Sequence, residues 1–251
     1  MLKYKNESLE NLKSDKRNDK FSFIVNSIIY KVPLSYALGI SRKICQLYLQ
    51  DPSIKEYYIN IENNYKDFEK LINGENIESE FVYKIGIILD NEEMINLYKK
   101  YNPLSKENVM KRIKITKEIM KRNPDISNNL IKYNKEELDY IGQNLGKMKE
   151  KMNQLTNEEI IYILKKTSIS IENEEMILNI IKTQLQTIND TKDIKENRLR
   201  KRNQRKELIE CINIQYLTTK SLKEYINLIE EEDIKGEIWN ELKKNFNNSF
   251  R

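Results

Sequence analysis

Histidine is absent from this chain of 251 residues, and its absence excludes much of common enzyme chemistry. Histidine is the usual proton shuttle near neutral pH and a frequent zinc ligand. A Ser-His-Asp or Cys-His catalytic arrangement therefore cannot form. No Walker-type phosphate loop and no G-x-G-x-x-G fingerprint occurs either. Lysines, tyrosines and carboxylates remain, but nothing in their spacing specifies a reaction. We therefore expect no catalytic residues, no cofactor and no metal.

Cysteine is almost as scarce, with only Cys45 and Cys211 far apart in the sequence. Two distant cysteines cannot form a thiolate zinc site, and buried free thiols in a reducing compartment are the favoured interpretation. No apolar run approaches the roughly 20 residues that cross a bilayer. Met1 is followed by charged and polar residues, which is not the pattern of a signal peptide. We expect a cytoplasmic or nuclear protein without a membrane partner.

Glycine (6) and proline (4) are also rare, which favours long helices and short turns. Apolar residues make up 39% of the chain and charged residues 33%, with a mean hydropathy of −0.74. The apolar residues recur periodically, so we expect a folded chain long enough for two domains. Lysine, asparagine, isoleucine and tyrosine are abundant and share A/T-rich codons. The net charge of +5 therefore does not by itself indicate a nucleic-acid partner.

Residues 21 to 62 carry the clearest pattern in the chain. Apolar and polar residues alternate in two runs joined by Asn26 and Ser27, which predicts a β-hairpin. Pro33 cannot continue a strand ladder but fits the first turn of a helix, so a helix is expected to follow at once. Alternation at residues 57 to 61 predicts a third strand that returns to the hairpin. The order is hairpin, amphipathic helix and strand.

This order resembles the opening of a BTB/POZ domain, a family of protein-interaction domains. The residues that match the strand and helix pattern of the family are Phe23, Val25, Tyr30, Ser41 and Ile44. Those that match its later helices are Phe68, Leu71, Ile72, Gly74, Ile85, Leu89 and Ile95. The chain departs from the family at Pro33, where a histidine is usual. It departs again at Lys20, where an aspartate near the family's dimer interface is common.

The second half of the chain reads as helix pairs with short links, typical of an all-α module. Thr156 and Glu159 have the spacing of a capping box, and Ser221 with Glu224 predicts a second helix start. A last helix is predicted around Trp239. Residues 170–186 and 208–226 are similar to helices of the BACK domain, which often follows BTB, although Asn213 replaces a common arginine.

The expected fold class is α+β and mostly α, with a small BTB/POZ-like sheet and helical hairpins followed by an all-α BACK-like module. The expected organisation is a charged N-terminal tail at 1–19, a BTB/POZ-like domain at 20–103, a helical connector at 104–155 and a BACK-like helical domain at 156–251.

The resemblance implies a non-enzymatic adaptor that binds protein partners. One partner it suggests is a cullin scaffold of a ubiquitin ligase, to which the adaptor would deliver a substrate. A homodimer is a second expectation, and an architectural homo-oligomer without a ligase connection is the alternative. The candidates for self-association are Leu9 and Leu12. The candidates for partner docking are Leu49, Gln50, Asp51 and Tyr65.

A basic run at residues 198 to 206 lies between two predicted helices. It contains six cationic residues and no acid, namely Arg198, Arg200, Lys201, Arg202, Arg205 and Lys206. One interpretation is a phosphate-binding patch for nucleic acid or a nuclear-localisation signal. The other, an exposed loop made basic by composition bias, is favoured because no aromatic residues are interleaved to stack on bases. We therefore do not expect a nucleic-acid partner.

Overall fold

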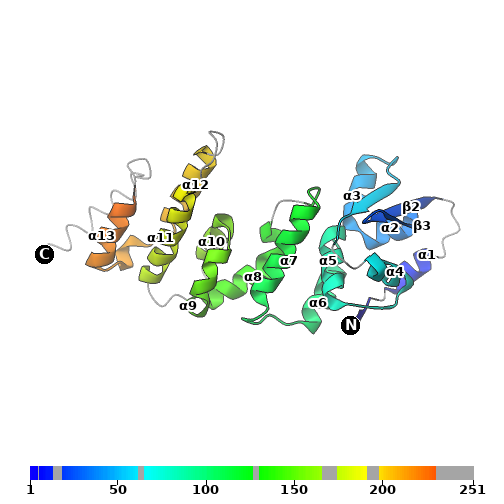
Figure 1. Cartoon of the computed structure of the whole chain (residues 1–251), viewed down its shortest axis with the longest axis horizontal. Coiled ribbons are helices and arrows are strands. Elements are labelled where there is room, and N and C mark those ends of the chain that lie inside the picture. The colour runs from blue at the N-terminus through cyan, green and yellow to red at the C-terminus, as the bar shows by residue number, and fades with distance from the viewer. Residues whose placement is uncertain are drawn as a thin grey trace. The chain divides into compact units, whose positions relative to one another are not determined.

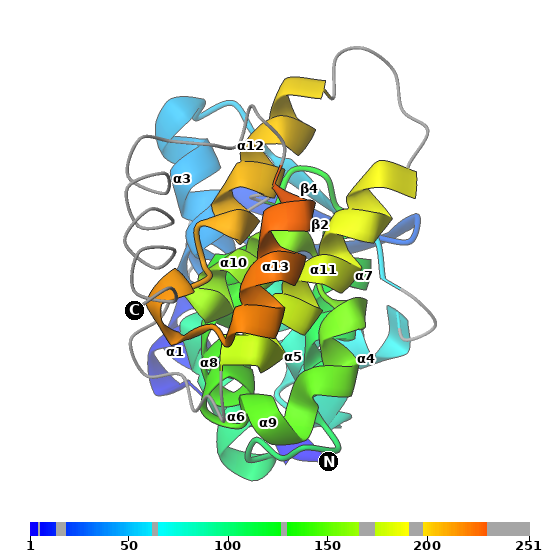
Figure 2. The same cartoon turned by 90° about the vertical axis from the view of Figure 1, so that its left-hand side faces the viewer.

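The computed structural model describes residues 1–4, 6–13, 19–61, 65–126, 130–165, 174–190 and 198–229. The chain divides into two compact units, Met1–Asn134 and Lys135–Arg251, which we call unit 1 and unit 2. Helices dominate both units, and unit 1 also contains a small sheet (Figures 1 and 2). The predicted fold class, α+β and mostly α, is confirmed.

The predicted sheet of unit 1 is present. Its three strands follow the order β3-β2-β4, with β2 and β3 antiparallel and β4 parallel to β2. Asn26 and Ser27 join β2 to β3 with φ angles of 47° and 74°. Positive φ at both turn residues matches the right-handed twist of a hairpin. The strands are β2 (Lys20–Val25), β3 (Ile28–Pro33) and β4 (Glu56–Ile59).

The single helix predicted after Pro33 is two helices, α2 (Leu34–Ile40) and α3 (Arg42–Gln50). Ser41 separates them in an extended conformation. Its hydroxyl accepts a hydrogen bond from the Ile44 amide at 3.1 Å and donates one to the Leu89 carbonyl at 2.9 Å. Serine is a favoured N-cap residue because its hydroxyl satisfies a free amide of the first turn. The apolar periodicity continues from α2 into α3, so the sequence pattern gave no sign of the break at Ser41.

The rest of unit 1 packs helices against the inward face of the sheet. Phe68 contacts Phe23 and Tyr30, with ring centroids 5.3 and 5.2 Å apart. Gly74 ends its helix with a φ of 69°, as the sequence predicted. The remaining elements are β1 (Leu2–Lys3), α1 (Glu7–Lys13), α4 (Tyr65–Asn73), β5 (Asn76–Ile77), α5 (Ser79–Leu89), α6 (Glu92–Tyr101) and α7 (Val109–Arg122).

The described part of the expected N-terminal tail is folded into unit 1. Strand β1 pairs with β5, and α1 packs against α2. Leu2, Tyr4 and Leu9 are buried. The charged residues of this segment therefore lie on the outer side of elements whose apolar residues complete the core.

All the described secondary-structure elements of unit 2 are helices. The predicted capping box is confirmed, because the Thr156 amide donates to Glu159 at 2.7 Å and the Glu159 amide donates to the Thr156 hydroxyl at 3.3 Å. Its elements are α8 (Leu130–Gln143, which begins in unit 1), α9 (Leu145–Met148), the 3-10 helix η1 (Lys149–Gln154), α10 (Asn157–Leu164), α11 (Glu174–Asp190), α12 (Arg198–Ile209), η3 (Ile214–Tyr216) and α13 (Thr219–Leu228).

The predicted cap at Ser221 is wrong by one turn. The N-cap of α13 is Thr218, whose hydroxyl accepts from the Ser221 amide. Both hydroxyls also donate to Glu175 of α11, at 2.8 and 2.9 Å. The start of α13 is therefore set by a carboxylate of another helix, which local sequence does not reveal. The helix predicted around Trp239 lies outside the described residues.

The division between the units falls inside the predicted connector. Helix α7 belongs to unit 1, where its buried Ile115 and Ile119 join the hydrophobic core and α7 packs against α5. Asn123, directly after α7, pairs with the backbone of Asn60 beside β4 through two hydrogen bonds of 3.0 Å. The first part of the connector therefore completes unit 1, and residues from Lys135 on belong to unit 2.

Candidate functional site

Three of the predicted docking residues lie together at the end of α3. Leu49 is 78% exposed, and Gln50 and Asp51 are exposed beside it. The backbone amide of Asp51 caps α3 by donating to the Leu47 carbonyl. We call Leu49, Gln50 and Asp51 the α3-end surface. Tyr65 begins another helix, α4, and its side chain lies outside the described part.

Asp51 gives the α3-end surface a fixed negative charge. Its carboxylate accepts hydrogen bonds from the Ser53 hydroxyl at 2.6 Å and from the Ser53 amide at 2.9 Å. These bonds favour the ionised form and lower the pKa of Asp51 below its ordinary value. They also lock the turn between α3 and β4. The surface thus presents a large apolar side chain next to a preoriented carboxylate.

The predicted self-association pair is packed inside its own unit. Leu9 is only 5% exposed, and Leu12 is partly buried. Both leucines lie against Gly39 of α2, so closely that a Cβ atom at Gly39 would come within 2.7 Å of Leu9 and 2.9 Å of Leu12. A contact with a second chain through these leucines would require α1 to leave α2.

The basic run forms helix α12, and the prediction of a loop is wrong. Arginine, lysine and glutamine favour helices, and the apolar Leu208 and Ile209 at the end of the same helix are buried. Arg205 is only 8% exposed, and its guanidinium donates to the carbonyl of Leu228 at the end of α13. This arginine therefore joins two helices and is not available to a phosphate.

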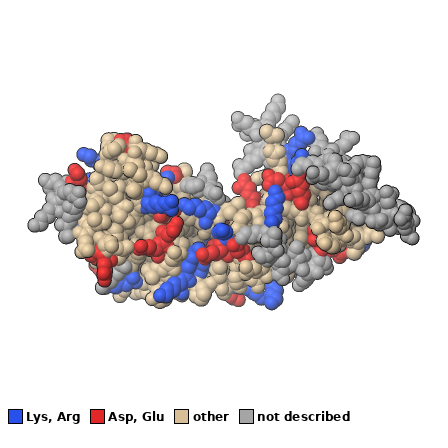
Figure 3. Space-filling model, turned by 180° about the vertical axis from the view of Figure 1, so that it is seen from behind, with Lys and Arg blue, Asp and Glu red and all other residues tan. Residues whose placement is uncertain are grey.

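The other members of the basic run whose side chains are described differ in exposure. Arg202 is exposed, whereas Lys201 and Lys206 are half-buried. The side chains of Arg198 and Arg200 lie outside the described part. On the face shown in Figure 3, described basic and acidic side chains lie beside one another. An intermixed surface gives a weaker long-range attraction for nucleic acid than a patch of one sign.

An exposed apolar row on the sheet was missed by the sequence analysis. Ile24 and Ile29 are cross-strand partners, and Ile24 is also the partner of Tyr58 on β4. Ile29 is 59% exposed and Tyr58 is 64% exposed. The available signal was the presence of isoleucine at the positions that alternate with the core residues of the hairpin. Such positions are normally polar when a sheet face meets water.

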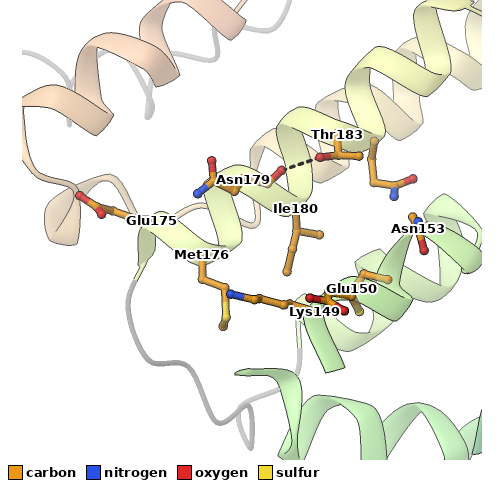
Figure 4. A pocket seen from close by; sticks show the side chains of 10 residues that line it. Lys149, Glu150, Asn153, Glu175, Met176, Asn179, Ile180 and Thr183 are labelled. Atoms are coloured by element: carbon orange, nitrogen blue, oxygen red, sulfur yellow. Dashed lines mark hydrogen bonds between the residues drawn. The ribbon is translucent and has the colours of Figure 1, made fainter. Parts of the chain in front are cut away.

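A cavity in unit 2 lies between η1 and α11 and has a volume of about 510 Å³. Figure 4 shows Lys149 and Glu150 of η1 opposite Met176 and Ile180 of α11. Within α11 the Thr183 hydroxyl donates to the Asn179 carbonyl at 3.0 Å. The lining mixes apolar, amide and charged side chains, and it does not by itself define a reaction or a ligand.

Glu175 also lines this cavity, but it is engaged with α13. The hydrogen bonds from Thr218 and Ser221 lower the pKa of Glu175, so this carboxylate is ionised and stabilises the start of that helix. Among the described residues, no group of three or more histidine, cysteine or acidic side chains could hold a metal ion. The described helices include none with the length and apolar character to cross a membrane.

Comparison with known proteins gives no family for the chain. No protein-family model matches it, and no curated protein is similar to it in sequence. The resemblance to BTB/POZ and BACK domains therefore stays a prediction, and the functional argument depends on the geometry of the surfaces described above.

Proposed function

We propose that the protein is a non-enzymatic adaptor that binds a protein partner through unit 1. The observation that carries this proposal is the α3-end surface. Leu49 is 78% exposed although Ile44 of the same helix is fully buried. Burying a leucine side chain contributes roughly 1.5–3 kcal/mol, which is a strong reason for a partner to cover it. The adjacent carboxylate of Asp51 would orient that partner through a positive group.

The partner class comes from the resemblance to BTB/POZ domains. It is a cullin scaffold of a ubiquitin ligase, to which the protein would bring a substrate. The three-stranded sheet with α2 and α3 between β3 and β4 supports this proposal, because it has the hairpin, helix and strand order on which the resemblance depends. The alternative, an architectural homo-oligomer, requires no such partner.

The test is affinity capture of the tagged full chain from its own cells, at moderate salt, with mass spectrometry of the co-purifying proteins. We expect a cullin and its ring-finger partner to be enriched. We expect Leu49→Asp to reduce their recovery at least about tenfold, because a buried unpaired charge costs more than 1.4 kcal/mol. A pull-down with the purified cullin then tests direct contact.

The matched control is Tyr101→Asp. Tyr101 is a 61% exposed apolar residue of the same unit, outside the α3-end surface. Equal losses in the two variants would indicate a general effect of the added charge and contradict the assigned surface. Recovery of the bait alone, or of the same partners with and without Leu49→Asp, would also contradict the proposal.

A further inference from the structure

The outward face of the β3-β2-β4 sheet is exposed on both edge strands, and its central residues Ser22 and Ile24 are half-buried. The inward face holds Phe23 and its neighbours against α4 and α2. On the outward face, the described register places six side chains in two rows that cross the strands, and Lys20 lies beyond these rows at the start of β2. The apolar row contains Ile29, Ile24 and Tyr58, and the charged row contains Lys31, Ser22 and Glu56.

The charged row has opposite signs on its two edges. Lys31 lies on β3 and Glu56 lies on β4, and both are exposed. Within the described part of the chain, neither side chain has an ion-pair partner. The Tyr58 hydroxyl donates to one oxygen of Glu56 at 2.9 Å, which holds the carboxylate toward the face and leaves its other oxygen for a second donor. The central Ser22 separates the two charges.

We propose that this outward face joins two copies of the chain through a two-fold axis that runs along β2. Such an axis exchanges the two edge strands. It places Lys31 of one copy opposite Glu56 of the other, and it does so twice. It also places Ile29 opposite Tyr58, and Ile24 opposite its own copy. The two rows are thus complementary to themselves in charge and in apolar character, as a two-fold interface requires. The exposed Lys20 at the first residue of β2 lies beyond the rows and would face its own copy, so its long side chain must extend away from the axis.

Other arrangements of the same face are less complementary. An axis perpendicular to the strands, passing between the rows, would put Lys31 opposite Ile29 and bury a charge against an apolar side chain. A partner unrelated to this chain would have to carry its own pair of opposite charges at the spacing of Lys31 and Glu56, whereas a second copy carries that pair already. The pattern therefore favours a second copy, with the two sheets packed face to face in the aligned manner.

The contact is small, so the dimer should be weak. Strands lie about 4.8 Å apart and rise about 3.3 Å per residue, which makes the face roughly 200 Å². A standard interface buries about 800 Å² per partner. A groove of about 610 Å³ continues the face between Tyr58, Asn26 and the end of α7. We expect a dissociation constant on the order of 100 µM and a dimer that forms only at high local concentration.

The test is the oligomeric state of the full chain by sedimentation velocity, from about 10 µM to about 500 µM, a range that brackets the expected constant. Four proteins are compared, namely the natural chain, Lys31→Glu, Glu56→Lys and the double variant. Each single reversal places like charges opposite one another twice in the dimer, so we expect at least about tenfold weaker association. The double variant exchanges the two signs and should associate as the natural chain does.

Two controls separate the interface from general effects of charge and folding. Lys66→Glu makes the same change in net charge as Lys31→Glu, at an exposed position on α4, and it should leave association unchanged. Ile29→Thr keeps a β-branched residue in β3 and removes apolar contact, so it should weaken association while the circular dichroism spectrum stays the same.

The proposal is overturned if the natural chain is monomeric at about 500 µM, well above the expected constant. It is also overturned if the single reversals have no effect, or if the double variant fails to recover association. This proposal does not rest on the adaptor function. Leu49→Asp should leave the dimer unchanged, and Lys31→Glu should leave capture of the α3-end partner unchanged.

Discussion

The two units bury different kinds of polar group. In the described part of unit 1, most buried polar side chains are neutral, and several of them complete the hydrogen bonding of the backbone at strand and helix ends. They are Ser41, Asn91, Arg112, Thr116, Asn123 and Asn134. In the described part of unit 2 four of the six are charged, namely Glu137, Glu159, Glu174 and Arg205, and the neutral ones are Gln184 and Ser221.

This difference follows from the backbone hydrogen-bonding groups that each architecture leaves unpaired. A sheet with helices packed across it leaves unpaired backbone groups at its edges. The side-chain amide of Asn123 satisfies two of them, because it accepts a hydrogen bond from the backbone amide of Asn60 and donates one to the Asn60 carbonyl. Helices that pack in pairs leave amides and carbonyls at their ends, where charged side chains are favoured by the helix dipole. Unit 1 should therefore depend on apolar packing, and unit 2 should depend more on individual charges.

The largest expected effect is the loss of a core aromatic residue in unit 1. Phe23 is fully buried, and the centroid of its ring lies 5.5 Å from that of Phe21 and 5.3 Å from that of Phe68. We expect Phe23→Ala to lower the free energy of unfolding of unit 1 by about 3–5 kcal/mol. Hydrogen exchange with mass spectrometry, resolved by segment, should show faster exchange across β2, β3 and α4 while unit 2 keeps its protection.

The control for this prediction is Tyr101→Ala, an exposed position of unit 1, which should change the free energy of unfolding by less than about 0.5 kcal/mol. Equal loss of protection in both units after Phe23→Ala would mean that they unfold together. The comparison between separately stabilised units would then fail.

A medium effect is expected from Arg205, a buried cation of unit 2. Arg205→Ala leaves the Leu228 carbonyl without its charged donor, so we expect a loss of about 1–3 kcal/mol from unit 2. Arg202→Ala, one turn earlier on the same helix and exposed, should have almost no effect on stability. Chemical denaturation followed by circular dichroism measures both. If the two variants lose equal stability, burial of Arg205 is not what stabilises α12.

The smallest expected effect is an opposite response of the units to pH. Glu80 of unit 1 is partly desolvated, which opposes its ionisation. Hydrogen bonds from Lys111 at 2.7 Å and Lys84 at 2.8 Å outweigh this and lower its pKa below 4.5. Burial raises the pKa of Glu174 in unit 2 above 4.5, although the Asn213 amide donates to its carboxylate. Glu80 therefore stabilises unit 1 above about pH 4.5 and loses this contribution on acidification.

Glu174 acts in the opposite direction. Its contribution to unit 2 is fully present below pH 4.5 and is lost as the pH rises through its folded pKa. Segment-resolved hydrogen exchange between about pH 4 and about pH 7, corrected for intrinsic rates, measures both trends. Glu80→Gln should flatten the response of unit 1, and Glu174→Gln should flatten that of unit 2. A parallel response of both units in the two variants would contradict the assignment.

Short-range patterns predicted much of the local structure. The hairpin, its turn at Asn26 and Ser27, the returning strand, the end of α4 at Gly74 and the capping box at Thr156 all depend on residues within a few positions of one another. The prediction of the cap at Ser221 failed because Glu175, far away in the sequence, contributes to the start of α13. Helix boundaries that depend on distant partners have no local signal.

The candidate surfaces were harder to predict than the elements. Leu49, Gln50 and Asp51 are adjacent in sequence, so they lie together in any structure in which α3 ends there. Leu9 has the spacing of a surface stripe on a short helix, but Gly39 leaves room for it to pack inside unit 1. Arg205 and Arg202 have the same chemistry in one basic run, yet one is buried and the other is exposed.

The sequence by itself determined the fold class, the order of hairpin, helix and strand, and the absence of histidine chemistry, because composition and short periodicities set these properties. Only the tertiary structure decided where unit 1 ends, which cation of α12 is buried, and which side chains face outward together on the sheet. These properties depend on contacts between residues that are far apart in the chain. Lys31 and Glu56 become edges of one face only when β4 pairs with β2.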